Sequence, residues 1–240
     1  MDRFYTRYRF GQVFTHVKRA PLHVAQQIAA IPGVAQVQTR VVVDVNLNVE
    51  GMAEPALGRL ISVAENERSG PAMNRVHLRE GRHIVHERAG EALVSEAFAK
   101  AHGLRPGDSV TAIINGRLDT LRIVGVALSP EYIYQIRPGD ILPDDKRFGV
   151  FWMSERQLAP AFDMDGAFND VSVTLHHAAN EAEVIRRLDE ITDRYGSLGA
   201  YGRDDHPSHQ FVSNELRELR GMTVIAPTIF LLVAAFLLNV

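Results

Sequence analysis

Histidines recur in this chain at a spacing that could hold a metal ion, in the pairs His83/His86 and His206/His209. On a helix, two histidines three residues apart lie on one side and could ligate zinc together. Neither pair carries the adjacent glutamate of a His-Glu-x-x-His motif, and both are surrounded by residues typical of loops. We therefore predict neither a metal site nor a cofactor.

Other candidate motifs, for calcium binding or catalysis, are also incomplete. Asp163-x-Asp165-Gly166 is similar to the start of a calcium loop but lacks its later glycine and its terminal glutamate. Ser95 has no Gly-x-Ser-x-Gly elbow and is better placed to begin a helix, with Glu96 in the first turn. The sequence has no cysteine, no phosphate-binding glycine loop and no dinucleotide fingerprint. We predict a non-catalytic chain; the alternative is a membrane-tethered envelope hydrolase that uses Ser95 or a His/Asp cluster.

Composition and charge describe a folded chain without affinity for nucleic acid. Of its 240 residues, 46% are hydrophobic and 23% are charged, as in ordinary globular proteins. The 26 Lys and Arg residues against 29 Asp and Glu residues give a net charge of −3. Since there is no overall positive field, we expect no nucleic-acid partner.

The C-terminal residues differ from the rest of the chain. Residues 222–240 contain no charged side chain, and as a helix they would extend about 28 Å, close to the ~30 Å of a bilayer core. They predict a transmembrane helix; the alternative is a buried core helix. Charged residues alternate with leucine just before it, which predicts a polar stalk over residues 206–221. Within the stalk, the residues expected to couple the membrane helix to the folded part of the chain are Leu216, Leu219 and Arg220. The residues expected in the membrane are Met222, Pro227, Phe230 and Leu238.

The remaining sequence alternates helix and strand signals. Residues 21–31 and 181–195 have the apolar stripe of amphipathic helices, and residues 34–49 and 57–63 have the alternation of strands. Asn115-Gly116 joins two apolar runs, which predicts a tight hairpin. Residues 130–148 contain three prolines and predict an irregular excursion. Together these patterns predict an α+β protein with a β-rich insertion.

Several motifs of the chain resemble the extracytoplasmic core domain of FtsX/MacB-type ABC transporter permeases. The motifs that carry the resemblance are Gly81-Arg82, Leu93-Val94-Ser95-Glu96, Gly103-Leu104-Arg105-Pro106-Gly107-Asp108, Ile123-Val124-Gly125, Lys18-Arg19-Ala20-Pro21 and Ile31-Pro32-Gly33-Val34.

The resemblance implies how the chain is divided into domains. We expect a porter-like α/β lobe formed by residues 21–80 and 149–205, with a small β-rich lobe, residues 81–148, inserted into it. The stalk (206–221) and transmembrane helix (222–240) would follow, and residues 1–20 would lie near the membrane. The chain is expected to be part of a larger membrane protein.

The resemblance also implies a function. The chain would engage a substrate or partner outside the cytoplasm and follow ATP-driven motion of the membrane helices, in export of lipoproteins, lipids, peptides or drugs, or in mechanotransmission. Its partners would be a cytoplasmic ATP-binding subunit, a second permease and membrane lipid, at a bacterial inner membrane with most of the chain in the periplasm. The residues expected to contact the ligand are Tyr132, Tyr134 and Ile136, in the excursion. A non-transporting adaptor or division regulator remains an alternative.

Overall fold

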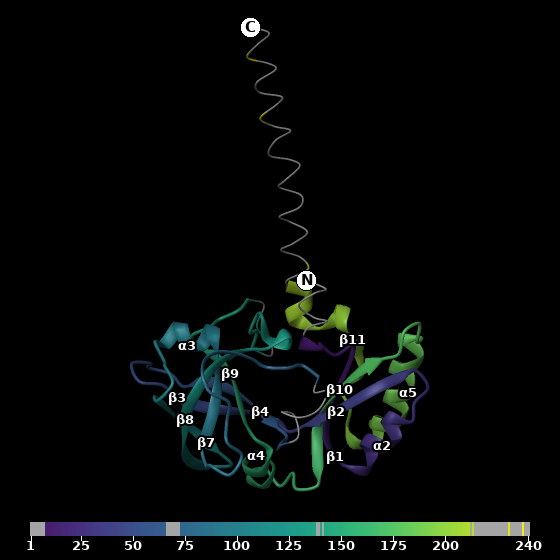
Figure 1. The fold of residues 1–240 in the computed structure, drawn as a ribbon, viewed down its shortest axis with the longest axis horizontal. Helices are drawn as coiled ribbons and strands as arrows, with labels where there is room; N and C mark the ends of the chain where they lie inside the picture. Colours follow the sequence, from purple (N-terminus) through teal and green to yellow (C-terminus); the bar gives the residue numbers. More distant parts are fainter. Residues whose placement is uncertain are drawn as a thin grey trace.

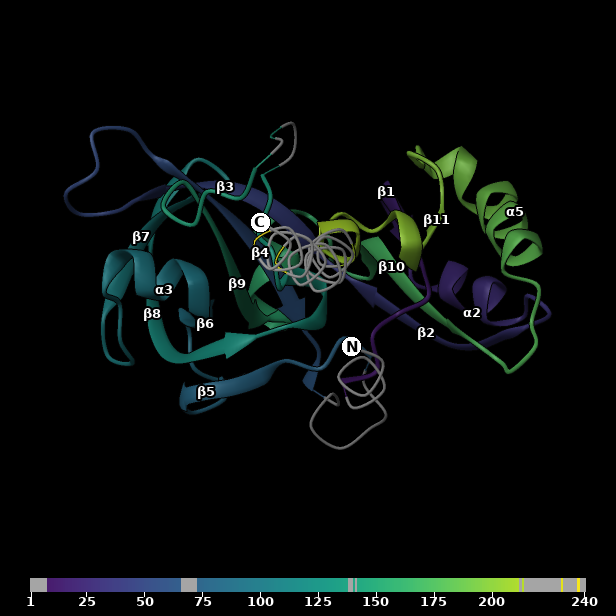
Figure 2. The same ribbon diagram turned by 90° about the horizontal axis from the view of Figure 1, so that it is seen from above.

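A computed structural model describes residues 8–65, 73–137, 140, 142–211, 213, 230 and 237. Within this part of the chain the strands form two sheets, one of four strands and one of seven. Each sheet belongs to a separate lobe, and the two lobes lie side by side (Figures 1 and 2). The chain is therefore an α+β protein, as predicted.

The smaller sheet forms what we call the α/β lobe, which is built from the two ends of the described chain. Its order is β11-β1-β10-β2, and neighbouring strands are antiparallel. Two helices, α2 and α5, cover one face (Figure 2). Two β-α-β units thus interleave in one sheet. The elements are β1 (Val13–Pro21), α2 (His23–Ala29), β2 (Val34–Arg40), β10 (Ala167–Leu175), α5 (Glu181–Thr192) and β11 (Tyr201–Gly202).

Helix α5 follows from the sequence pattern, whereas α2 is shorter than the helix predicted over residues 21–31 because Pro21 belongs to β1. Asn180 precedes α5, and its side chain accepts a hydrogen bond from the Glu183 N–H at 3.3 Å, which satisfies one of the free donors of the first turn. Val184 and Leu188 are buried on the sheet side of α5. The α-helix ends at Thr192 and continues as one 3₁₀ turn to Tyr195, so the predicted helix over 181–195 is confirmed with a tighter last turn.

The larger sheet forms what we call the barrel lobe. Its order is β5-β8-β6-β9-β4-β3-β7, and β7 also pairs with β8. This last pairing closes six of the strands into a ring, while β5 lies outside it beside β8. The elements are β3 (Val42–Asn48), β4 (Ala56–Val63), β5 (His77–Gly81), β6 (Glu91–Ser95), α3 (Glu96–His102), β7 (Ser109–Ile114), β8 (Arg117–Leu128), β9 (Phe148–Ser154) and α4 (Glu155–Ala161).

The predicted hairpin between β7 and β8 is confirmed. Ile114 pairs with Arg117, and Asn115 and Gly116 between them have φ values of 46° and 77°. Two residues with positive φ are what a type I′ turn requires, and Asn-Gly is the pair that adopts it at least cost.

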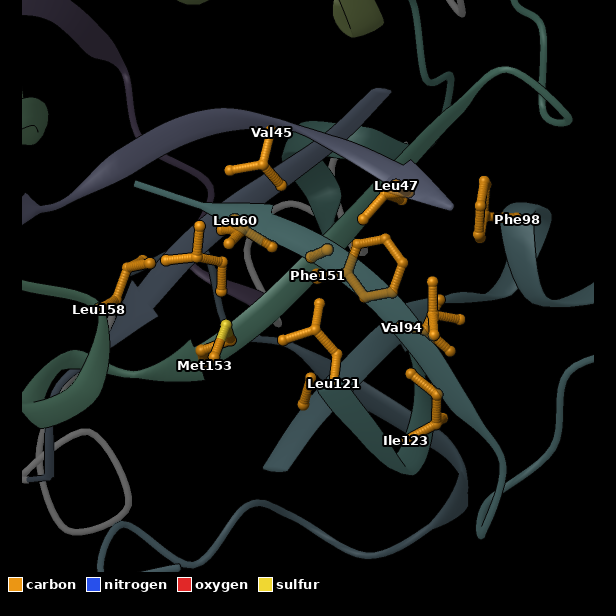
Figure 3. Close-up of a cluster of buried hydrophobic side chains, with 14 of the residues drawn as sticks. Val45, Leu47, Leu60, Val94, Phe98, Leu121, Ile123, Phe151, Met153 and Leu158 are labelled. Carbon is orange, nitrogen blue, oxygen red and sulfur yellow. The ribbon is translucent and has the colours of Figure 1, made fainter. Parts of the chain in front are cut away.

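The centre of the barrel is filled by one apolar cluster, shown in Figure 3. A second cluster, which includes Leu93 and Trp152, packs on the opposite face of the central strands. Strands β6 and β9 are consequently buried along their whole length, and they read as continuous apolar runs rather than as alternating ones. Labelled members of the first cluster are Val45, Leu47, Leu60, Val94, Phe98, Leu121, Ile123, Phe151, Met153 and Leu158.

Replacing Gly149 with alanine is expected to lower the free energy of unfolding by about 1–3 kcal/mol, the usual cost of overfilling a core. A Cβ at this position of β9 would lie 2.6 Å from the Phe98 ring and 3.0 Å from the Phe151 ring. Urea unfolding measures the change. Ser109→Ala, at an exposed strand position, is the control and should change the value by less than about 0.5 kcal/mol. Equal stability of Gly149→Ala and wild type would contradict this packing.

The two sheets divide the chain differently from the predicted ranges. Strands β3 and β4, expected in the porter-like lobe, lie in the seven-stranded sheet. The cause is a long-range parallel pairing of β4 with β9, from Leu57↔Phe148 to Val63↔Ser154. The β-rich insertion thus runs from β3 to α4, rather than over residues 81–148.

The single strand predicted over residues 34–49 is two strands, one in each lobe. The chain leaves the α/β lobe after Arg40 and enters the barrel lobe at Val42. Side chains satisfy the backbone at this crossing: Ser62 Oγ accepts from Val41 N–H at 2.8 Å. Asn169 of β10 accepts from Val42 N–H at 2.8 Å and donates to Val42 O at 2.7 Å. The alternation of β-branched residues continues across the crossing, which is why the sequence does not reveal it.

Asn169→Asp is expected to destabilise the protein by about 1–3 kcal/mol, because the carboxylate keeps the shape but loses the donor to the buried Val42 carbonyl. Chemical unfolding at neutral pH measures this cost. Asn46→Asp, an exposed change on β3, is the matched control. If both variants were equally stable, the bridge between β10 and the crossing would not contribute to stability.

The predicted stalk and transmembrane positions fall mostly outside the described residues. Leu216, Leu219, Arg220, Met222, Pro227 and Leu238 all do so. Phe230 and Leu237 are described; both are helical, with exposed fractions of 78% and 68%, and so neither belongs to a buried core. Within the described part of the chain, no helix has both the length and the apolar character needed to cross a bilayer.

Candidate functional site

A buried ion cluster joins the two lobes. Arg40, at the end of β2, donates to both oxygens of Glu131, from Nη1 to Oε2 at 2.6 Å and from Nη2 to Oε1 at 2.7 Å. Its Nε also donates to Asp170 Oδ1 on β10 at 2.8 Å. Arg40 and Asp170 belong to the α/β lobe, whereas Glu131 follows β8 of the barrel lobe. One guanidinium therefore holds a carboxylate from each lobe.

Glu131 is presented to this cluster by a short capped turn. Residues Pro130–Tyr132 form a 3₁₀ turn directly after β8. Ser129 precedes it, and its Oγ accepts from the Glu131 N–H at 3.3 Å. Proline at the first position fixes the backbone for such a turn. The irregular stretch predicted at residue 130 therefore begins with a defined element that aims Glu131 at Arg40.

Burial and pairing set the ionisation of the cluster. The side chains of Arg40 and Glu131 are only 5% and 3% exposed, and that of Asp170 is 19% exposed. Burial acts to raise the pKa of Asp170, but the positive charge of Arg40 together with the hydrogen bonds from His16 and Arg40 outweighs it and holds that pKa at about 2. Burial raises the pKa of Glu131 above its usual value, against the attraction of Arg40. Both Glu131 oxygens accept N–H donors, which is the geometry of an ionised carboxylate.

A second polar bridge reinforces the junction beside the cluster. Ser172 Oγ of β10 accepts from Arg40 Nη2 at 3.2 Å and from Asn74 Nδ2 at 3.0 Å. Asn74 lies before β5 and also accepts from the Gly11 N–H at 2.8 Å. The N-terminal approach to β1 is thereby attached to both lobes.

A cavity of about 650 Å³ opens at the same junction. Its wall includes Glu131 and Asp170 of the ion cluster, together with Arg59, which forms two hydrogen bonds of 2.8 Å to Asp44. The three predicted contact residues all line it; they are Tyr132, Tyr134 and Ile136. The three residues therefore lie together on one wall of the cavity.

The start of the C-terminal helix forms another wall. Residues 207–211 are helical and lie over the junction of the lobes (Figures 1 and 2). Tyr134 N–H donates to Ser208 Oγ at 3.2 Å, and the rings of Tyr134 and Phe211 are 5.8 Å apart. On the other side, the His206 ring lies 4.9 Å from that of Phe14 in β1. His206 and the helical segment that follows it thus contact both lobes between them.

The histidine and serine candidates do not assemble into a catalytic or metal site. His86 is buried and bonds to Ser154 Oγ at 3.1 Å, whereas His83 is exposed. His206 lies among aromatic rings, and His209 lies 3.5 Å from Asp204. Among the described residues, no group of three or more His, Asp or Glu side chains is arranged to hold a metal.

Ser95 stands at the N-cap position directly before α3, as predicted, but its hydroxyl is used elsewhere. It is buried, donates to Gln135 Oε1 at 2.9 Å and accepts from the Val150 N–H at 3.2 Å. Neither partner can act as a general base. The role of Ser95 is to tie the residue 130–148 excursion to the barrel.

Sequence reasoning missed the residues that carry the charge of this site. Arg40, Glu131 and Asp170 lie far apart in the sequence and belong to no motif. A possible signal was Glu131 itself, an acidic residue between Pro130 and Tyr132 in an otherwise apolar stretch.

No protein-family model and no curated protein sequence matches the chain significantly. Solved structures do match it. The chain is similar to an extracellular and a periplasmic domain of known structure. The extracellular domain of the noncanonical ABC-type transporter YknZ from Gram-positive bacteria matches with 14% identity, over 80% of this chain and 98% of that one, at a TM-score of 0.47. The periplasmic region of MacB from Actinobacillus actinomycetemcomitans matches with 11% identity, over 89% and 95% of the two chains, at a TM-score of 0.48.

Proposed function

We propose that this chain is the extracytoplasmic domain of an ABC-type permease, and that it engages a substrate or partner while following motion of membrane helices. One observation carries the proposal: the described chain enters and leaves its folded body at one place. Val13 pairs with Gly202 and Phe14 with Tyr201, and the Arg203 N–H donates to Gln12 O at 2.8 Å. A domain inserted between two membrane helices needs such neighbouring ends.

The contacts of residues 206–211 give a route for coupling. Because this segment touches Phe14 of the α/β lobe and Tyr134 of the barrel lobe, a displacement of the segment acts on both lobes where they meet. Packed elements with discrete arrangements transmit such displacements. The uncharged residues 222–240 that follow would connect this segment to the bilayer.

A hydrolase is less well supported. The Ser95 hydroxyl is committed to Gln135 and Val150, and the buried His86 bonds to Ser154 instead. ATP hydrolysis would be supplied by a cytoplasmic ATP-binding subunit, and a second permease and membrane lipid would complete the assembly.

Membrane fractionation tests the proposal. Residues 1–240 and a version ending at Arg220 are expressed in bacteria, and each is assigned to the membrane or soluble fraction. We expect the longer chain in the membrane fraction and the shorter chain to be soluble and folded by circular dichroism. A soluble longer chain, together with an unfolded shorter one, would overturn the proposal, since residues 221–240 would then belong to the core.

A further inference from the structure

The cavity between the lobes has an aromatic wall. Two of the rings, Tyr132 and Tyr134, come from the barrel lobe's excursion, and the others come from β1, β11 and the C-terminal segment. A volume of about 650 Å³ is in the range of sites for small organic ligands. The aromatic residues of the wall are Phe14, Tyr132, Tyr134, Tyr201 and Phe211.

The same cavity carries an excess of negative charge. Its wall contains Arg59 and Arg137, and Arg40 lies directly behind it, bonded to Glu131. Against these three arginines stand four carboxylates. The four are Asp44, bonded to Arg59, and the wall residues Glu131, Asp140 and Asp170.

The excess charge is accessible from the cavity. Asp170 contacts Arg40 through Oδ1, by the hydrogen bond from Nε and an ion-pair contact with Nη2, whereas its Oδ2 lies 3.7 Å from His16 Nδ1. His206 does not supply the missing cation: burial, reinforced by the charge of Arg40, lowers its pKa to about 3. A positive group in the cavity would meet the Asp170 carboxylate in a wall that also holds five aromatic residues.

We propose that this cavity binds a small organic monocation, a substituted ammonium group with an apolar body. Ring faces attract cations through their quadrupole, and a partly desolvated site strengthens that attraction. A net charge of one sign in the same site selects against anions of similar size. This inference rests on the proposed function, because it names the chemical class of ligand that the extracytoplasmic domain would bind at the junction of its two lobes.

The protein has its own reporter of binding. Its single tryptophan, Trp152, is buried, and its ring lies 6.5 Å from that of Tyr132 at the cavity wall. A ligand that moves Tyr132 should change the tryptophan emission, which gives a spectroscopic signal that is specific to this wall.

Three probes of similar size test the proposal on residues 1–240 in a non-ionic detergent: benzyltrimethylammonium, neutral N,N-dimethylbenzamide and anionic phenylacetate. Calorimetry gives the affinities, and tryptophan emission locates the binding. We expect the cation to bind at least tenfold more tightly than the neutral probe and the anion not to bind. Equal affinity for the cation and the neutral probe, or no binding of the cation to the folded protein, would overturn the proposal.

Charge variants distinguish binding in this cavity from non-specific binding elsewhere on the protein. Asp170→Asn should weaken binding of the cation about tenfold, and Asp119→Asn, an exposed acid on β8, should leave it unchanged. Arg137→Gln, at an exposed position on the cavity wall, should strengthen binding about threefold, a gain that misfolding cannot produce. An unchanged or weaker affinity in Arg137→Gln would contradict the charge selection. Because fractionation does not depend on these affinities, failure of this inference is distinct from failure of the proposed function.

Discussion

Replacing Arg40 with methionine is expected to lower the free energy of unfolding by about 3–5 kcal/mol, the cost of leaving buried charges without their partner. The change would leave Glu131 and Asp170, one from each lobe, without the guanidinium that both contact. The loss should appear in urea unfolding at neutral pH. Arg122→Met, at an exposed position of β8, is the control and should shift the value by less than about 0.5 kcal/mol.

A second variant separates charge from packing at this cluster. In the triple variant Arg40→Met, Glu131→Gln, Asp170→Asn, no charge of this cluster remains, and we expect it to recover at least half of the loss, because neutral groups are far cheaper to bury. A loss below 1 kcal/mol in Arg40→Met alone would show that the cluster does not hold the lobes together.

Lowering the pH from 7 to 5 is expected to cost wild-type protein about 2 kcal/mol more than it costs His206→Phe. His206 is 8% exposed, and burial lowers its pKa from 6.5 to about 3. The unfolded chain therefore binds a proton at His206 near pH 6.5, whereas the folded protein does not bind this proton until the pH approaches 3. Stability from this group is complete above pH 6.5 and falls progressively as the pH drops toward 3.

Unfolding titrations at pH 7 and pH 5 measure this difference. Phenylalanine preserves the contacts of the His206 ring with Phe10 and Phe14, at 5.3 Å and 4.9 Å between ring centres, while it removes the titration. His177→Gln, at an exposed position, should retain the wild-type dependence. If wild type and His206→Phe lost the same stability between the two pH values, His206 would not be buried as a neutral group.

Local patterns predicted local elements, and long-range pairing decided the rest. Asn115-Gly116 and the stripe of α5 depend on neighbouring residues, and both predictions are confirmed. The parallel pairing of β4 with β9 joins residues about ninety positions apart. The hydrophobic pattern of the sequence does not indicate which of several apolar strands will pair with each other. The predicted lobe boundaries failed for that reason.

The candidate site divides in the same way. Tyr132, Tyr134 and Ile136 stand close together in an apolar stretch between prolines, and their place at the cavity wall could be anticipated. Arg40 is one of 26 basic residues in the chain, and its importance comes from two carboxylates that only the assembled lobes bring to it.

The interleaved α/β lobe has a consequence for synthesis. The barrel lobe is continuous in sequence, so it can close as soon as β9 has left the ribosome. Strand β1 must wait for β10, to which it pairs from Val13↔Val173 to Pro21↔Ala167. At usual rates of translation that wait is roughly 7–30 s. During it, Val13, Val17 and Ile28, all fully or almost fully buried in the finished lobe, have no sheet to cover them, so the newly made N-terminal segment is where a chaperone would be needed most.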